Sequence, residues 1–168
     1  MIILKPYNAN WPSLYEQEKE ILMTVGGKWI EAIEHIGSTS IPNIYAKPVI
    51  DIMMGLKNLS IADQHLVQLI QQLGYDYIAE YEKQMPYRRY FQKINGEGGH
   101  THHIHLVETG TEFWNRHIAF RDYLRNHSDI AKEYEALKLS LAPKFTDTNA
   151  YASAKTDFIK RVEALANQ

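Results

Sequence analysis

One apolar segment interrupted by a single carboxylate constrains the fold more than any other part of the sequence. Residues 48–55 read Pro-Val-Ile-Asp-Ile-Met-Met-Gly, which is typical of a buried strand. Asp51 is the exception, and a charge inside such a strand is costly to bury unless it has a partner. Because side chains alternate along a strand, we expect Ile50 and Ile52 to face helices while Asp51 projects from the opposite face of the sheet.

A turn of small residues precedes this strand. It contains Gly37, Ser38, Thr39 and Ser40. Backbone N–H groups at such a turn are natural ligands for anions, and hydroxyl groups add further donors. We therefore predict a phosphate-binding turn close to Asp51. The alternative is that small residues occur here only because the turn is tight.

A later strand carries two histidines on one face. We expect this strand from His102 to Val107, with His103 and His105 pointing the same way. If the aliphatic residues of both strands face the helices, the two imidazoles project from the same side of the sheet as Asp51. One carboxylate and two imidazoles can hold a divalent metal (Mn, Zn or Mg), and nitrogen ligands suit zinc or manganese better than magnesium. The alternative is that the histidines are half-exposed strand residues with polar neighbours.

The periodicity of apolar residues divides the chain into two parts. Residues 1–110 alternate between predicted helices and strands, whereas residues 111–168 read as helices, the last of them from Asn149 to the end. We expect one α/β (α+β) domain with a mixed sheet, helices on one face and a C-terminal helical segment packed on it. A length of 168 residues is sufficient for one such domain with a sizeable core.

Composition argues against several classes of protein. A net charge of −2 gives no global basic field, so we expect no extended nucleic-acid surface. The absence of cysteine excludes disulfides and thiolate metal sites and fits a reducing cytoplasm. Residues 1–6 lack the apolar core of a signal peptide, and no segment approaches the roughly 20 apolar residues of a membrane span. We therefore expect a cytoplasmic protein without a membrane partner, and the oligomeric state is left open.

Four separated motifs resemble the GrpB (UPF0157) family. They are HIGSTSIPNIYAKPVIDIMMGL from His35, RRYFQK from Arg88, HTHHIHLVETG from His100 and WNRHIAFRDYLRNHSDIAKEYEALKLSLA from Trp114. The resemblance runs from Lys5 to Phe158 and implies a single GrpB-like domain over residues 1–168. This family is similar to the nucleotidyltransferase superfamily, which implies a nucleotidyltransferase-like core at 1–110 and a helical segment at 111–168. It also looks like the extra domain fused to dephospho-coenzyme A kinase in some bacteria.

The resemblance implies a nucleotide-binding cleft. Gly37 and Ser38 match the turn that grips nucleotide phosphate in the superfamily, and Asp51 matches its first metal carboxylate. One of the strand histidines lies where a third carboxylate is expected, while Met53 occupies the place of the second and cannot bind a hard cation. Two functions stay open. One is metal-dependent nucleotidyl transfer with Asp51 and Ser38 as catalytic residues. The other is a non-catalytic module that binds a nucleotide or a coenzyme A-related cofactor beside a degenerate metal site.

Four cationic side chains are further candidates for phosphate contacts. Lys47 immediately precedes the strand of Asp51, and Arg89 could form paired hydrogen bonds with a triphosphate. Arg121 and Lys155 belong to the helical segment that matches the family and would line the other wall of the cleft. The alternatives are a solvated Lys47 and ion pairs with nearby carboxylates for the other three. In either case the expected partner is a small-molecule nucleotide or another phosphate ligand.

Overall fold

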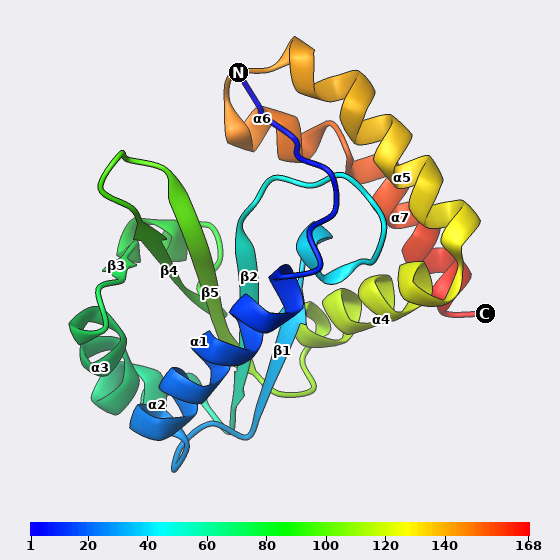
Figure 1. Cartoon of the computed structure of the whole chain (residues 1–168). Coiled ribbons are helices and arrows are strands. Elements are labelled where there is room, and N and C mark those ends of the chain that lie inside the picture. The colour runs from blue at the N-terminus through cyan, green and yellow to red at the C-terminus, as the bar shows by residue number, and fades with distance from the viewer.

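The strands form a single mixed sheet, as the computed structural model of residues 1–168 shows (Figure 1). Its order is β1-β2-β5-β4-β3, with β2 and β5 parallel and all other neighbours antiparallel. The strands are β1 (Ala32–Ile36), β2 (Ile50–Leu56), β3 (Asp76–Tyr77), β4 (Arg88–Ile94) and β5 (His100–Glu108). The expected α/β class with a mixed sheet is thus confirmed.

Helices from the first half of the chain cover one face of the sheet. They are α1 (Trp11–Gly26), α2 (Leu59–Ile61), one π-helical turn η2 (Ala62–Leu66) and α3 (Val67–Gln72). Trp11, Leu22 and Leu66 from these helices share a buried cluster with Ile52 and Ile104 of the sheet. This packing fixes the register of β2 and β5, because a slip by one residue would exchange their faces.

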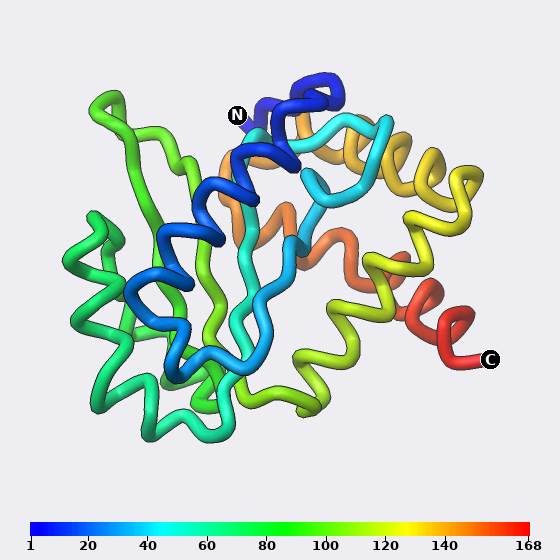
Figure 2. The backbone as a smooth tube through the Cα atoms, turned by 60° about the horizontal axis from the view of Figure 1, so that its bottom comes forward, coloured from blue at the N-terminus to red at the C-terminus, as the bar shows by residue number.

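The C-terminal helices begin on the opposite face of the sheet, where the first of them packs. They are α4 (Glu112–Asn126), α5 (Ser128–Leu141), η4 (Ala142–Lys144), α6 (Thr148–Ser153) and α7 (Thr156–Ala166). Phe113 of α4 packs against Ile36, Met53 and Val107, the residues of the sheet that point away from α1. Figures 1 and 2 show these helices beside β1 and β2, with β3 at the far edge of the sheet.

The segment between β1 and β2 joins the two parts of the molecule. It begins with Gly37 and a single 3₁₀ turn, η1 (Ser38–Ser40). Ile41 and Ile44 then pack against the C-terminal helices, in a cluster with Leu124 and Tyr134. The turn of small residues is therefore held between the sheet and the helical segment.

One expected helix is divided in two. The sequence pattern predicted a single helix from Asn149 to the end, which is wrong, because α6 stops at Ser153 and α7 starts at Thr156. Lys155 lies at this break. The interruption lets α6 and α7 run in different directions (Figure 1). No helix combines the length and the apolar character that crossing a bilayer requires.

Candidate functional site

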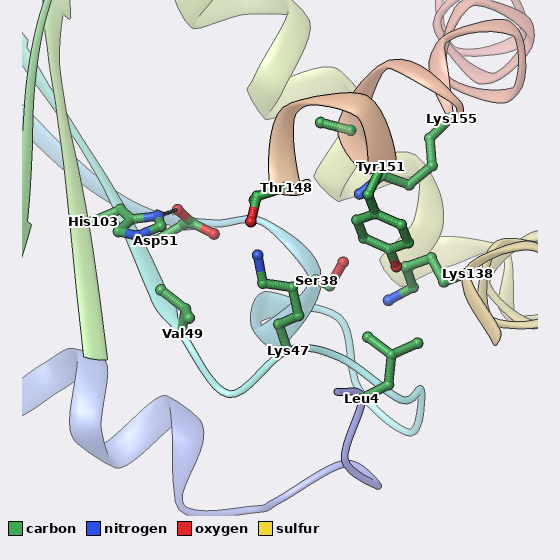
Figure 3. Close-up of a pocket in the computed structure, with 11 residues that line it drawn as sticks. Leu4, Ser38, Lys47, Val49, Asp51, His103, Lys138, Thr148, Tyr151 and Lys155 are labelled. Atoms are coloured by element: carbon green, nitrogen blue, oxygen red, sulfur yellow. Dashed lines mark ion pairs between the residues drawn. The ribbon is translucent and has the colours of Figure 1, made fainter. Parts of the chain in front are cut away.

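A polar cavity of about 130 Å³ opens where the sheet meets the C-terminal helices (Figure 3). Its walls come from the N-terminal segment, η1, the loop before β2, the strands β2 and β5, and the helices α5 and α6. Among the predicted site residues, Ser38, Lys47, Asp51, His103 and Lys155 line it. Residues from distant parts of the sequence therefore meet at one place.

The pairing of β2 with β5 brings the carboxylate and the imidazoles together. Asp51 lies opposite His103, and Met53 lies opposite His105, in the parallel register. The Oδ1 atom of Asp51 is 3.4 Å from Nδ1 of His103 and 3.5 Å from Nε2 of His105. The Asp51 side chain is 26 % exposed. Burial alone would raise the pKa of Asp51, but hydrogen bonds from both histidines outweigh it and hold that pKa well below its usual range.

Gly37 lies directly against this carboxylate. Its φ of +74° is a left-handed conformation that disfavours residues with a side chain. A Cβ atom placed on Gly37 would be 2.5 Å from Oδ2 of Asp51. The close approach explains why the turn begins with glycine, and it sets the position of the carboxylate relative to Ser38.

Arg88 determines how His105 contacts Asp51. Nη1 of Arg88 lies 3.2 Å from Nδ1 of His105. A guanidinium can only donate, so Nδ1 accepts, and Nε2 of the neutral ring carries the hydrogen that it donates to Asp51. Burial lowers the pKa of His105, which favours this neutral ring.

Three lysines surround the cavity. The side chains of Lys47, Lys138 and Lys155 turn into the same space (Figure 3). None of them forms a salt bridge with a carboxylate. Lys138 is 2 % exposed, and its amine donates a hydrogen bond of 2.5 Å to the carbonyl oxygen of Tyr45.

Burial lowers the pKa of each of these lysines. The pKa of Lys138 falls to about 7, with burial the largest cause and repulsion from Lys155 the next. The pKa of Lys155 falls to about 8, through burial and then repulsion from Lys47. The pKa of Lys47 is lowered by burial and raised in part by Asp51. Buried amines of this kind are costly in the absence of a negative group.

Several predicted site residues lie outside the cavity. Thr39 uses its hydroxyl within the fold, 2.9 Å from Nε2 of His35, and the hydroxyl of Ser40 donates to the carbonyl of Gly37. Arg89 forms an ion pair of 2.8 Å with Asp63. Arg121 is likewise held by carboxylates, those of Glu34 and Asp122, at 2.6 and 2.9 Å. These four side chains are engaged within the protein.

Other cavity residues were not predicted from the sequence. They include Lys138, Thr148 and Tyr151. The hydroxyl of Tyr151 is buried and has no hydrogen-bond partner. One signal was present for Lys138, because Ala131, Tyr134 and Lys138 follow one another at helical spacing on the buried face of α5. A lysine on such a face needs an anion or a carbonyl as partner.

The arrangement of donors does not fit the expected metal centre. No group of three or more histidine, aspartate or glutamate side chains is placed to hold a metal ion. A metal-binding histidine normally donates its other N–H to a carboxylate or carbonyl. The second nitrogen of His105 instead faces the donor group of Arg88, so the nitrogen toward Asp51 has no free lone pair. Met53 is fully buried among apolar side chains and supplies no ligand.

Comparison with known proteins gives consistent matches. The family model described as "GrpB protein" matches residues 1–165. The chain is 42% identical to UPF0157 protein YqkA of Bacillus subtilis, over 96% of this chain and 46% of that protein. The crystal structure of conserved protein GrpB from Enterococcus faecalis matches with a TM-score of 0.85 and 34% identity, over 98% of this chain and 96% of that one.

A more distant similarity involves a longer protein. The chain is 25% identical to dephospho-CoA kinase of Mycolicibacterium paratuberculosis, over 94% of this chain and 44% of that protein. The chain therefore spans less than half the length of this relative and of the Bacillus protein.

Proposed function

The chain belongs to the GrpB family, and on this premise we propose that its lysine-lined cavity binds the phosphate group of a nucleotide or of another phosphate-containing ligand. The observation that carries the proposal is the convergence of Lys47, Lys138 and Lys155 without a carboxylate partner. The ammonium group of buried Lys138 and those of half-buried Lys47 and Lys155 repel one another. An oxyanion between them removes that repulsion and restores the hydrogen bonds lost on burial.

The size of the cavity limits what enters it. A volume of about 130 Å³ is below the roughly 300 Å³ at the lower end for pockets that enclose a whole small ligand. The phosphate group is therefore the part that enters, and the rest of the ligand lies outside. Ser38 offers a hydroxyl at the wall, and Asp51 and His103 lie at the sheet side of the cavity (Figure 3).

Binding is supported better than group transfer. Two-metal nucleotidyl transfer needs several carboxylates to hold its ions and offset their charge. Asp51 is the carboxylate of this cavity, and the position expected to supply a second one is the buried Met53. The proposed function is thus that of a nucleotide- or phosphate-binding module. Its sequence resembles nucleotidyltransferases, but we do not propose that it transfers a nucleotidyl group.

A coenzyme A-related ligand is the second candidate. The similarity to dephospho-CoA kinase favours it, since that protein's name refers to a ligand with a phosphate-rich nucleotide end. The two candidates share the phosphate chemistry of the cavity. They differ only in the part of the ligand that extends beyond it.

Thermal-shift and calorimetric titrations test the proposal. Adenosine, AMP, ADP, ATP, dephospho-coenzyme A and coenzyme A are each added to the whole chain. We expect phosphate-bearing ligands to bind and adenosine to fail. Lys138→Met should weaken binding at least tenfold, because one ion pair to phosphate is lost. Lys160→Met, an exposed lysine of α7, is the matched control and should bind normally. Equal affinity in the Lys138 and Lys160 variants would remove the cavity as the binding site.

A further inference from the structure

We propose that the lysines of the cavity supply the positive charge which a divalent ion supplies in metal-dependent phosphate sites, so that phosphate binds here without a metal. This inference rests on the proposed function. The inference adds that the lysines neutralise the charge of the phosphate. It also means that the divalent metal suggested by the sequence is not needed for binding.

The first argument is charge balance. When all three are protonated, Lys47, Lys138 and Lys155 carry three positive charges, and Asp51 carries one negative charge, which leaves a net charge of +2 around the cavity. A phosphate monoester carries about −1.5 to −2 near neutral pH. Because a bound anion favours the protonated form of all three lysines, the charges match without an added ion. A divalent cation in the same space would stand beside three ammonium groups with a single carboxylate to offset it.

The second argument concerns the donors that a metal would need. Asp51 is already contacted by His103 and His105. His105 presents an N–H group to Asp51, because Arg88 occupies its other nitrogen. Nε2 of His103 lies 2.8 Å from Nδ1 of His100, so this ring too is engaged at both nitrogens. The two imidazoles are therefore engaged at both nitrogens and offer no free lone pair to a metal ion, which leaves Asp51 as the one open ligand of the group.

The third argument is an unsatisfied donor on the wall of the cavity. Tyr151 is 2 % exposed, and its hydroxyl has no partner within the protein. Buried hydroxyl groups are rarely left unpaired. The ring also lies under the amine of Lys155, with Nζ 4.3 Å from the ring centre, which holds that amine at the wall. A phosphate oxygen in the cavity would accept from both groups, whereas a cation would be repelled by the amine.

Calorimetry with inorganic phosphate tests the inference on the unmodified protein. The titration is made in EDTA and repeated with millimolar Mg²⁺ and with millimolar Mn²⁺. We expect the Kd in the three conditions to agree within about threefold, because the lysines and not an ion bind the phosphate. Binding that vanishes in EDTA and returns with Mg²⁺ or Mn²⁺ would overturn the inference and leave the proposed function intact. Absence of binding in all three conditions would overturn both.

Variants separate the contributions of the lysines in the same assay. Lys155→Gln and Lys47→Gln should each weaken phosphate binding in EDTA by at least tenfold, and Lys155→Arg should recover most of the loss because it keeps the charge. Lys160→Gln is the control for general charge. Circular dichroism and the melting temperature establish that each variant is folded. If both glutamine variants bind as the wild type does, the lysines do not neutralise the phosphate and the inference is wrong.

Discussion

At the scale of single residues, Lys138 shows how the site departs from an ordinary core. It lies on the buried face of α5, one turn after Tyr134, which packs against Ile41 and Ile44 of the segment between β1 and β2, yet it ends in an amine. An apolar side chain would fill the same place without the cost of burying that amine. Such a cost is typical of positions at which binding, not stability, determines the residue. The same reasoning applies to Gly37, whose backbone conformation is strained for any residue with a Cβ atom.

Gly37→Ala should therefore be destabilising in two ways. With φ of +74° and ψ of −178°, Gly37 lies in a backbone region populated almost only by glycine, which costs about 1–3 kcal/mol for alanine. The new methyl group would also overlap Oδ2 of Asp51. We expect a loss of about 2–3 kcal/mol in the free energy of unfolding, measured by urea denaturation. Gly110→Ala is the matched control, because Gly110 has a φ of +80° but open space around it. Equal losses in the two variants would show that Gly37 does not set the position of the carboxylate.

At the scale of elements, alternation along strands predicted more than any other signal. It placed Ile50 and Ile52 toward the helices and Asp51, His103 and His105 on the other face, which is how β2 and β5 are packed. Alternation along strands could not predict that α5 and α6 form the other wall of the cavity. Contacts between helices and a loop some ninety residues apart, such as that of Lys138 with Tyr45, leave no periodic pattern in the sequence. The Lys155 break between α6 and α7 was missed for a similar reason, since no proline or glycine marks it.

Helix α4 holds the turn of small residues from outside the cavity. Nη1 of Arg121 donates to the carbonyl of His35 at 3.1 Å and pairs with Glu34. Nε of Arg125 donates to the carbonyl of Ser40 at 2.9 Å. The two arginines therefore fix both ends of the segment that contains Ser38, a residue of the cavity wall. We therefore propose that Arg121, which does not line the cavity, is a positioning residue for the proposed phosphate site.

Arg121→Met should weaken both the fold and the site. Loss of a buried guanidinium leaves its partners unpaired, so we expect unfolding to become easier by about 2–3 kcal/mol. Phosphate affinity should also fall several-fold at a temperature where the variant is folded, because the turn is less well held. Arg116→Met, an exposed ion-pair residue of the same helix, should cost about 1 kcal/mol or less and bind normally. Unchanged phosphate affinity in the folded Arg121 variant would contradict the positioning role.

At the scale of the whole molecule, the cavity exists only where three regions of the chain meet. Leu4 comes from the N-terminal segment, Asp51 from the sheet, and Tyr151 from the C-terminal helices. An anion bound there bridges all three regions and opposes their separation, so it should stabilise the entire fold rather than one element. The strength of that effect depends on how many of the cavity lysines carry a proton.

Sulfate is a suitable probe of this dependence, because its charge is constant between pH 6 and pH 9. The lowered pKa values of Lys138 and Lys155, about 7 and about 8, mean that both amines are mostly charged at pH 6.5 and mostly neutral at pH 9. Binding at pH 9 must first return protons to them, which weakens affinity by roughly tenfold for each pH unit above a lysine's pKa. We expect millimolar sulfate to raise the melting temperature at pH 6.5 and to have little effect at pH 9, relative to sodium chloride of equal ionic strength. The pH dependence should shrink in Lys138→Met, which has one fewer titrating amine. An increase in melting temperature of equal size at both pH values would show that these lysines do not bind the anion.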